Sequence, residues 1–308
     1  MIKILIELPT WLGDAIMASP AIENLISYCN DPVVTLIGSD VAVSALKNNP
    51  RVFKIIVLDK KFRNLYKQKT LGEFDLFVSF RGSIRSKLLL SFVSAKNKFQ
   101  YDKRKYKKTH QVEKYNSFIN ECLGKNDFAG ELKLFNTINI NNNKNKILGI
   151  NPGASYGSAK RWDAKEFAKV ACDLSSQYDI VILGGPAEKD IAADIEKYLI
   201  EKNINNYQNL ASKTTISELI DKISQLDLFI TGDSGPMHVA AAFKVSTVAI
   251  FGPTNDSETS QWLNEKSVIV KKNLECQPCM KRTCPLKHQN CMKLIKASDV
   301  LEAVKNMN

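Results

Sequence analysis

The sequence ILIELPTWLGDAIMASPAIENL, residues 4–25, runs from an apolar stretch through a short turn into a stretch with helix-like spacing. A strand that passes through a turn into a helix is the repeating unit of parallel α/β sheets. The turn crowds Trp11, Gly13 and Asp14 together. The carboxylate of Asp14 can cap the helix, or it can face a cleft and act on a ligand, and both interpretations are open.

The same alternation of strand and helix patterns continues along the chain, with one break at a polar, asparagine-rich stretch near residues 136–146. It predicts two doubly wound α/β domains, residues 1–140 and 147–308. Ligands bind at the carboxyl ends of the strands in such sheets, so a shared site is expected where those ends face each other across a cleft. The predicted strands are 2–8, 33–38, 52–58, 74–80, 147–153, 179–185, 226–231 and 246–252. The predicted helices are 14–28, 39–49, 83–95, 163–177 and 215–225, the last two opening with capping boxes at Asp163 with Glu166 and at Thr215 with Glu218.

The composition is that of a globular cytoplasmic protein. The 308 residues are 44% hydrophobic and 24% charged, which suffices for two domains that each bury a core. Glu7 and Pro9 stand where a signal peptide needs an unbroken apolar core, and no apolar run is long enough to span a membrane. Seven cysteines, an odd number, fit a reducing compartment better than a disulfide framework.

The formal net charge of +11 indicates a surface that attracts anions. Much of the excess lies in residues 96–114, where tyrosines are interleaved with basic side chains. The basic residues at its centre are Lys103, Arg104, Lys105, Lys107 and Lys108. This segment is either a solvated loop or a basic lip that holds a negatively charged acceptor or an anionic membrane surface. A nucleic-acid-binding protein would also explain the charge, but it leaves the strand-end turns without a purpose.

Two further strand-end turns combine glycines with cationic or hydroxyl groups. NPGASYGSAKRW, residues 151–162, brings two glycines together with Lys160 and Arg161. TGDSGPMHVAAAF, residues 231–243, places two glycines and Ser234 before a predicted helix, whose free N–H groups would point at an anion. Neither a Walker A loop nor a GxGxxG fingerprint is present, which disfavours a nicotinamide dehydrogenase. Together these turns predict a diphosphate site.

WLGD, NPGASYGSAKRW, GDSGPMHVAAA and IFGPT, in this order and spacing, resemble the ADP-heptose:lipopolysaccharide heptosyltransferases, glycosyltransferase family nine. The resemblance covers almost the whole chain. It implies a GT-B type fold, with two Rossmann-like domains facing each other across a cleft. It further implies that the N-terminal domain mainly holds the acceptor and the C-terminal domain mainly holds ADP-heptose, in an inverting transfer that requires no cofactor.

The segment CQPCMKRTCPLKHQNC, residues 276–291, resembles a cysteine-rich stretch of the family members that add the second heptose. The implied acceptor is therefore lipid A that already carries Kdo and one heptose, in lipopolysaccharide core biosynthesis. The alternative within the family is transfer of the first heptose directly to Kdo. Because the acceptor is a lipid and the chain shows no anchor, we expect a monomeric cytoplasmic enzyme, peripheral at the inner leaflet of the inner membrane.

An inverting transfer needs one base and one means of stabilising the departing diphosphate. Asp14 is the predicted base, since it belongs to the acceptor domain at the carboxyl end of a strand. Lys160 and Arg161 are predicted to neutralise the leaving group. The turns and the resemblance supply the other candidates. These are Glu188 at the adenosine end, Thr231, Gly232, Asp233, Ser234, Gly235 and His238 for the donor, and Trp11, Gly13, Arg81 and Arg85 for the acceptor.

Several of these candidates have a structural alternative. Trp11 can simply pack its own turn. Arg81 and Arg85 can form surface salt bridges, and His238 can hold a neighbouring loop by a hydrogen bond. Asp233 can bind the sugar of the donor or hydrogen-bond within its turn, because an acid beside a diphosphate would be repulsive unless it points elsewhere.

Cys276, Cys279, Cys284 and Cys291, with His288 among them, have the density of a small zinc site. The spacing of the later pair matches no familiar zinc knuckle or ribbon, and reduced cysteines also pack well in a compact loop. Zinc at these four cysteines and a metal-free loop are both open.

Overall fold

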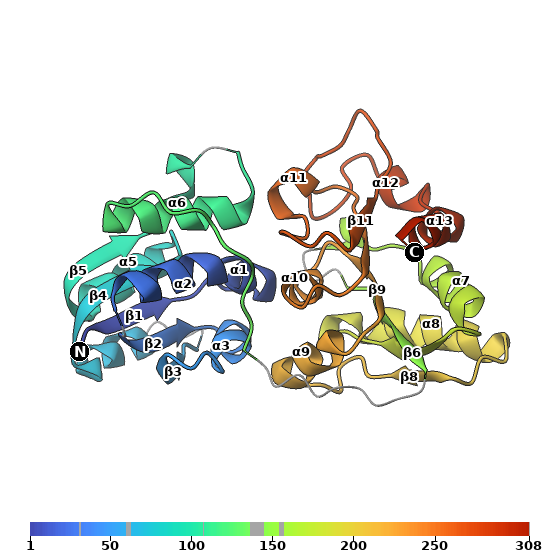
Figure 1. The fold of residues 1–308 in the computed structure, drawn as a ribbon. Coiled ribbons are helices and arrows are strands. Elements are labelled where there is room, and N and C mark those ends of the chain that lie inside the picture. The colour runs from blue at the N-terminus through green and yellow to red at the C-terminus, as the bar shows by residue number, and fades with distance from the viewer. Residues whose placement is uncertain (31, 60–62, 107, 136–144, 154–156, 308) are drawn as a thin grey trace. The chain divides into compact units, whose positions relative to one another are not determined.

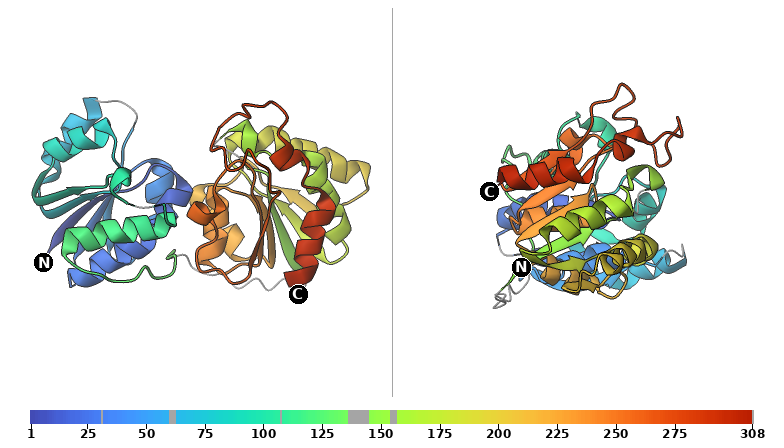
Figure 2. Two further views of the ribbon diagram at one scale, coloured as in Figure 1. Left: turned by 90° about the horizontal axis from the view of Figure 1, so that it is seen from above. Right: turned by 90° about the vertical axis from the view of Figure 1, so that its right-hand side faces the viewer.

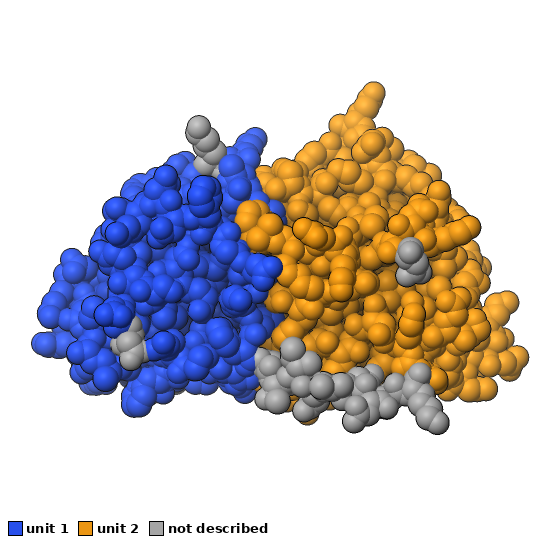
Figure 3. Space-filling model, viewed as in Figure 1, with its two compact units in different colours: residues 1–136 blue, residues 137–308 orange. Residues whose placement is uncertain are grey.

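The computed structural model describes residues 1–307 except 31, 60–62, 107, 136–144 and 154–156. The chain divides into two compact units, residues 1–136 (unit 1) and residues 137–308 (unit 2), which Figure 3 shows in different colours. Most of the asparagine-rich stretch lies outside the described residues. Each unit is built around one parallel β-sheet.

Unit 1 contains a five-stranded sheet in the order β3-β2-β1-β4-β5 (Figure 1). The residues of its central strands β1, β2 and β4 are mostly buried because helices cover both faces of the sheet. The strands are β1 Lys3–Glu7, β2 Val33–Gly38, β3 Val52–Val57, β4 Glu73–Ser79 and β5 Ser94–Gln100. The helices are α1 Leu12–Met17, α2 Ser19–Tyr28, α3 Asp40–Leu46, α4 Arg63–Tyr66, α5 Ile84–Phe92 and α6 Gln111–Leu123, with 3-10 turns η1 Lys67–Leu71 and η2 Lys103–Lys105.

Unit 2 contains a six-stranded sheet in the order β11-β10-β9-β6-β7-β8. The strands are β6 Lys146–Asn151, β7 Tyr178–Ile182, β8 Tyr207–Asn209, β9 Leu228–Gly232, β10 Thr247–Ile250 and β11 Ser267–Val270. The helices are α7 Ala164–Leu174, α8 Lys189–Glu201, α9 Ile216–Ser224, α10 Gly235–Ala242, α11 Asp256–Thr259, α12 Asn290–Lys293 and α13 Ala297–Met307, with 3-10 turns η3 Ser158–Lys160 and η4 Pro186–Glu188.

Helices cover both faces of the unit 2 sheet (Figure 2). Each face has its own apolar core. On one face, Phe167 of α7 and Val300 of α13 are buried together with Trp162. The Trp162 ring lies 4.6 Å from that of Phe167, and its indole N–H donates to the carbonyl oxygen of Ile295 at 2.9 Å. On the other face, Met237 of α10 packs beneath the sheet. Trp162 therefore serves the core of this unit.

The strand order reverses in both sheets beside the first strand of the unit. β1 lies between β2 and β4, and β6 lies between β7 and β9. The crossover helices of the two halves of each sheet consequently lie on opposite faces. Open α/β sheets bind ligands at the carboxyl ends of such a strand pair. The turns that follow β1, β4, β6 and β9 are therefore where the fold favours function.

The structure differs from the sequence-based expectation in several places of unit 1, where helices α4 and α6 were not predicted. Residues 94–100 form the edge strand β5, where the end of a helix and a basic loop were predicted. The predicted helix 14–28 begins earlier, at Leu12, and is divided at Ala18 into α1 and α2. The break precedes Pro20, which has no N–H to continue the helical hydrogen bonding. Within the described part of the chain, no helix combines the length and the apolar composition needed to cross a membrane.

Candidate active site

The turn after β1 presents Trp11 and Asp14 at the carboxyl end of the unit 1 sheet. Trp11 is 58% exposed, whereas Gly13 is buried and Asp14 is half-buried. Burial raises the pKa of the Tyr115 phenol in α6, and the negative charge of Asp14 raises it further. Asp14 therefore lies near Tyr115. The turn thus combines an open aromatic surface with a carboxylate that is only partly exposed to water.

Asp14 is not the N-cap of its helix. α1 begins at Leu12, and Trp11 occupies the N-cap position without a side-chain cap hydrogen bond. Asp14 is the third residue of the helix, and its backbone carbonyl accepts the N–H of Ala18 at 3.0 Å. The capping interpretation is therefore wrong. A negative charge in the first turn still favours the helix, by about 0.3–1 kcal/mol.

Glu7 is a fully buried carboxylate at the end of β1. The sequence indicated it only as an acidic residue within the apolar run ILIEL. Its oxygens accept from the hydroxyl of Ser79 at 2.5 Å and from that of Ser86 at 2.9 Å. Arg81 Nη1 lies 3.4 Å from Glu7 Oε1. Burial raises the pKa of Glu7, against the opposing effect of the Ser79 hydrogen bond and the Arg81 charge. This cluster holds Arg81 beside the ends of β1 and β4.

Arg81 and Arg85 have different partners. Arg81 forms an ion pair with Glu7, whose carboxylate is buried, so this is not the surface salt bridge that was the alternative. Arg85 donates instead to the backbone carbonyl of Asp59. Both arginines are half-buried, and both lie next to the start of α5, whose N-cap Ser83 is hydrogen-bonded by the N–H of Ser86 at 3.1 Å.

Asn151 connects three strand ends of unit 2, although the sequence pattern gave it no role. Its Oδ1 accepts the N–H of Gly153 at 3.3 Å and the hydroxyl of Ser234 at 3.3 Å, with the Thr231 hydroxyl 3.5 Å away. Its Nδ2 donates to the carbonyl oxygen of Leu183 at 3.1 Å. One amide therefore links the turn after β6 to the turn after β9 and to the residue that follows β7.

The turns after β6 and β9 also approach each other through their main chains. An added Cβ at Gly232 would lie 3.3 Å from the carbonyl oxygen of Gly153. Ser234 occupies the N-cap of α10 with an extended backbone, and Gly235 begins the helix. The N–H of Gly235, the first residue of this helix, is thus at the switch point of the unit 2 sheet, where anions are commonly bound; Pro236 has no N–H, and that of Met237 donates to the carbonyl oxygen of Ser234 at 3.2 Å.

Lys160 extends from η3 to the turn after β9. Its ammonium donates to Asp233 Oδ2 at 2.5 Å and lies 3.3 Å from the Asp233 carbonyl oxygen. The hydroxyl of Thr254 donates to the same Oδ2 at 2.6 Å. Thr254 belongs to the IFGPT motif and had not been singled out as a site residue. The Lys160 and Asp233 side chains are 11% and 8% exposed, so loss of either would leave a nearly buried charge without compensation.

The other predicted donor residues are arranged around this group. Glu188 is buried after β7, and its Oε2 accepts the N–H of Gly185 at 2.8 Å. It also packs closely enough that an added Cβ at Gly153 would lie 3.4 Å from Glu188 Cγ. His238 is buried in the first turn of α10, and Arg161 is exposed directly after Lys160.

The predicted basic lip is partly neutralised by acidic residues. Arg104 pairs with Asp102 at 2.7 Å, which lowers the pKa of that carboxyl to about 2, and Lys105 pairs with Glu121 at 2.8 Å. Lys103 and Lys108 are exposed, and Lys107 lies outside the described residues. The neighbouring rings of Tyr101 and Tyr106 stack with their centroids 5.4 Å apart. The segment is therefore a folded surface with η2 inside it, and not simply a solvated loop.

The four late cysteines are free thiols. Burial, together with the charges of Cys279, Cys276 and Cys284, raises the pKa of Cys291, so each of these three cysteines lies within electrostatic range of Cys291. Even so, no three His, Cys, Asp or Glu side chains among the described residues are placed to hold a metal ion. All four cysteines and His288 are among them, so this arrangement gives the zinc hypothesis no support.

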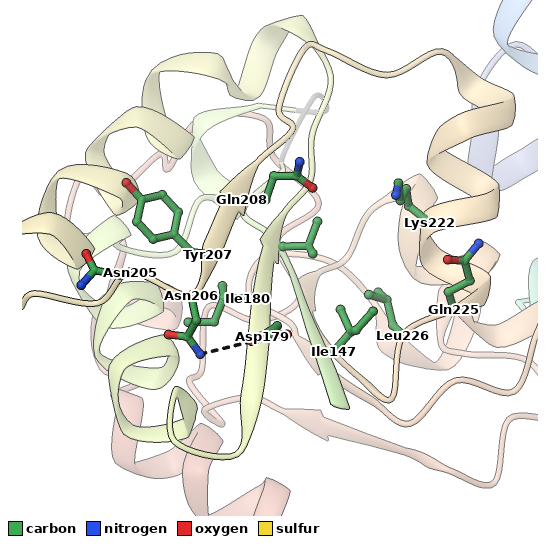
Figure 4. A pocket seen from close by; sticks show the side chains of 11 residues that line it. Ile147, Asp179, Ile180, Asn205, Asn206, Tyr207, Gln208, Lys222, Gln225 and Leu226 are labelled. Carbon is green, nitrogen blue, oxygen red and sulfur yellow. Dashed lines mark hydrogen bonds between the residues drawn. The ribbon is translucent and has the colours of Figure 1, made fainter. Parts of the chain in front are cut away.

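A hollow of about 370 Å³ lies elsewhere in unit 2, at the amino ends of β6, β7 and β8 (Figure 4). Its lining includes Ile147, Asp179, Tyr207 and Lys222. It lies at the amino ends of these strands, whereas the turns after β6 and β9 lie at the carboxyl ends. None of the predicted site residues lines it. Its position therefore does not favour it as the donor site.

Residues 63–290 match the family model described as "Glycosyltransferase family 9 (heptosyltransferase)". A Campylobacter jejuni protein named lipooligosaccharide heptosyltransferase 2 is 48% identical to the chain, over 99% of the chain and 98% of the relative. An Escherichia coli protein named lipopolysaccharide heptosyltransferase 3 is 25% identical, over 96% of the chain and 95% of its own length.

The fold is also that of solved structures. The E. coli ADP-heptose LPS heptosyltransferase II structure superposes with a TM-score of 0.82 at 20% identity, covering 99% of this chain and 98% of that one. The E. coli heptosyltransferase WaaC structure with ADP superposes with a TM-score of 0.80 at 12% identity, covering 100% of both. At these identities the likeness establishes the fold alone. It confirms the prediction of a GT-B type fold with two Rossmann-like α/β units.

Proposed function

Since the chain belongs to glycosyltransferase family 9, the heptosyltransferase family, we propose that it transfers heptose from ADP-heptose to the lipopolysaccharide or lipooligosaccharide inner core. The proposed acceptor is lipid A that carries Kdo and one heptose, so the chain adds the second heptose. The relative named heptosyltransferase 2, which matches along nearly the whole chain, supports this choice. The structural observation that carries the proposal is the group of Lys160, Asp233 and Thr254 at the switch point of unit 2.

The proposed reaction is a single displacement. A bond forms between an acceptor oxygen and the anomeric carbon of heptose while the bond from that carbon to the diphosphate oxygen breaks. The proton of the acceptor hydroxyl passes to a base, and the bonding electron pair leaves with ADP. Attack from the face opposite ADP inverts the anomeric configuration.

We propose Asp14 as the base and its surroundings as the acceptor side. Asp14 is a half-buried carboxylate at the switch point of unit 1, where such sheets bind ligands. Trp11 offers an exposed ring to the apolar face of a sugar. Arg81 and Arg85 supply positive charge for anionic groups of the acceptor, and the small Gly13 completes the turn.

We propose Lys160 as the group that stabilises the departing diphosphate. An ammonium has three donors, so Lys160 can keep its bond to Asp233 while it donates to a phosphate oxygen. Arg161 and the N–H of Gly235 at the start of α10 supply further donors, and the Ser234 hydroxyl joins them when it turns from Asn151 to the phosphate. The proposed donor surface also includes Glu188 at the adenosine end, with Thr231, Gly232, Gly235 and His238 around the diphosphate and sugar.

Transfer assays with two purified acceptors test the proposed function. One acceptor ends in Kdo, and the other already carries the first heptose. With ADP-heptose as donor, we expect product only from the heptosylated acceptor, with inverted configuration at the new linkage. Product only from the Kdo-terminated acceptor would make the chain the enzyme of the first transfer. No product from either acceptor would refute the proposal.

We further propose that transfer needs no metal ion, because the described cationic and N–H groups supply the charge stabilisation that a metal provides in other transferases. The enzyme is expected to keep its full turnover after treatment with EDTA and gel filtration, and to contain substoichiometric zinc when purified without added metal. Activity that falls on chelation and returns with zinc, but not with magnesium, would instead place zinc at the four cysteines.

We propose that the protein works as a cytoplasmic monomer that binds the inner leaflet reversibly through its basic segment. Changing Lys103, Arg104, Lys105, Lys107 and Lys108 to glutamine is expected to weaken binding to vesicles containing anionic lipid. The effect should be largest at low salt, because exposed charges are screened as salt rises. Since Arg104 and Lys105 have acidic partners, Lys103 and Lys108 alone should account for much of the loss.

A charge-matched variant controls for net charge in vesicle sedimentation. It carries glutamine at five exposed lysines of unit 2, namely Lys165, Lys189, Lys197, Lys202 and Lys213. This control should bind vesicles nearly as well as the parent protein, and both variants should bind ADP normally. Equal losses in the two variants would mean that net charge acts, and not the segment.

A further inference from the structure

The cysteine segment, residues 276–291, packs directly on the 3-10 turn η3, which carries the proposed leaving-group lysine. The N–H of Ala159 donates to the carbonyl oxygen of Arg282 at 3.1 Å. The side-chain Nε2 of Gln289 donates to the carbonyl oxygen of Ser158 at 2.9 Å. Two of the three residues of η3 are therefore hydrogen-bonded to the segment.

Gly157, the residue before η3, permits this close approach. A Cβ added there would overlap the carbonyl group of Arg282. Because the obstacle is main chain, no side-chain rotation can relieve the overlap. Any larger residue at position 157 must separate η3 from the cysteine segment.

The same segment also binds the turn after β10. Gln277 Nε2 donates to the carbonyl oxygen of Gly252 at 2.7 Å, and the N–H of Met280 donates to that of Pro253 at 2.8 Å. The residue that follows is Thr254. The segment thus contacts the two turns whose side chains, Lys160 and Thr254, both bind one carboxylate oxygen of Asp233.

The segment is itself ordered around a thiol. The backbone N–H groups of Gln289, Leu286, Lys287 and His288 lie close enough to the Cys284 thiol to lower its pKa. The N–H of Lys287 also donates to the carbonyl oxygen of Cys284 at 3.2 Å, so the chain turns back on itself beside this thiol. Cys291, two residues later, is buried and belongs to the core of unit 2.

We propose that residues 276–291 act as a clip that positions the diphosphate site, by holding the turns of Lys160 and Thr254 where both meet Asp233. This inference rests on the proposed function, in which Lys160 stabilises the departing diphosphate. Gln289 is the positioning residue that is simplest to test, because it contacts η3 through its side chain alone. The cysteines contribute the internal order of the clip, without any need for a metal.

Two variants test the clip by kinetics and ADP titration. Gln289→Met keeps the length of the side chain and removes its N–H donor. We expect kcat to fall about tenfold and the Kd for ADP to rise about threefold, as for one lost hydrogen bond and a displaced catalytic group. Gly157→Ala should act in the same direction and more strongly. KM for the acceptor should not change in either variant, whereas the Kd for ADP should rise. A general loss of folding would lower only the active fraction and leave both constants unchanged.

Matched substitutions elsewhere control for these changes. Gln208→Met replaces an exposed glutamine of β8, and Gly130→Ala adds a methyl group where no atom lies within 4 Å. Both controls should keep kcat, the Kd for ADP and the melting temperature of the parent. If Gly157→Ala fails to fold, Gln289→Met and Cys284→Ala, which removes the thiol beside which the segment turns back, still decide the question.

A double variant separates failure of the clip from failure of the proposed function. In the Lys160→Ala background, Gln289→Met should cause no further loss of kcat, because the group that it positions is absent. Additive losses, or full activity of Gln289→Met beside an inactive Lys160→Ala, would overturn the clip and leave the role of Lys160 intact. A fully active Lys160→Ala would overturn the leaving-group role, and the purpose of the clip with it.

Discussion

Asp14→Asn is expected to lower turnover by about 100-fold to 10,000-fold while the protein stays folded and still binds ADP. Asparagine keeps the shape of the side chain and one hydrogen-bonding oxygen, but it cannot take the proton of the acceptor hydroxyl. The charge lost from the first turn of α1 accounts for at most about 1 kcal/mol of stability. Steady-state kinetics at saturating acceptor, ADP titration calorimetry and thermal melting measure the three effects separately.

Asp40→Asn is the matched control for this experiment. Asp40 is also an acidic residue in the first turn of a helix of unit 1, and it is exposed at the start of α3. The control makes the same change of charge and should retain full turnover. If Asp14→Asn keeps more than about a tenth of the parent turnover, the loss is too small for a general base, and the base must be another residue.

Lys160→Ala is expected to lower kcat by about 100-fold to 1,000-fold and to weaken ADP binding to a smaller degree. The larger effect falls on kcat because negative charge on the diphosphate grows as the glycosidic bond breaks. The substitution also leaves the nearly buried carboxylate of Asp233 without its cation. Pre-steady-state transfer rates and ADP titration measure the two effects.

The double change Lys160→Ala with Asp233→Asn separates two roles of the lysine. Asparagine at position 233 can still accept the Thr254 hydroxyl but carries no charge to repel a diphosphate. ADP affinity should therefore recover in part, whereas kcat should stay low. Recovery of kcat to the parent value would mean that Lys160 only neutralises Asp233. Lys165→Ala, at an exposed lysine of α7, is the control and should be fully active.

Strands buried on both faces were the elements that the sequence predicted well. Their continuous apolar runs leave a strong signal, and β1, β2, β4, β6 and β9 all lie within the predicted ranges to within one residue. The edge strand β5, SAKNKFQ, left no such signal. This edge strand is half solvated and carries lysines that discourage pairing with other chains, so its sequence resembles a loop. The other edge strand of unit 1, β3, has the apolar sequence VFKIIV and was predicted at residues 52–58.

Local hydrogen bonds could be predicted, and distant ones could not. The capping box of Thr215 with Glu218 lies within one turn and is confirmed. Asp163 caps its helix without a reciprocal bond from Glu166, whose carboxylate accepts instead from the N–H of Ala297, 131 positions away. That partner exists only because α13 packs beside α7, which no local pattern encodes.

Contacts between distant residues of the candidate site could not be predicted either. Lys160 and Asp233 are 73 positions apart, and they meet because β9 pairs with β6 rather than with β8. Strand order follows from the packing of whole crossover units, so the chain's local pattern could predict two anion-binding turns but not their ion pair. Glu7 was missed for a related reason, since its partners come from β4 and α5.

The position of α13 after every strand of the unit 2 sheet has a consequence for synthesis on the ribosome. Unit 1 has all five of its strands within the first 136 residues, so it can fold while the rest of the chain is still being translated. The core of unit 2 is not complete until the carbonyl oxygen of Ile295 accepts the indole N–H of Trp162 and the side chain of Val300 is buried. A nascent chain therefore completes the unit of Asp14 early, and the unit of Lys160 only after α13 has emerged from the exit tunnel.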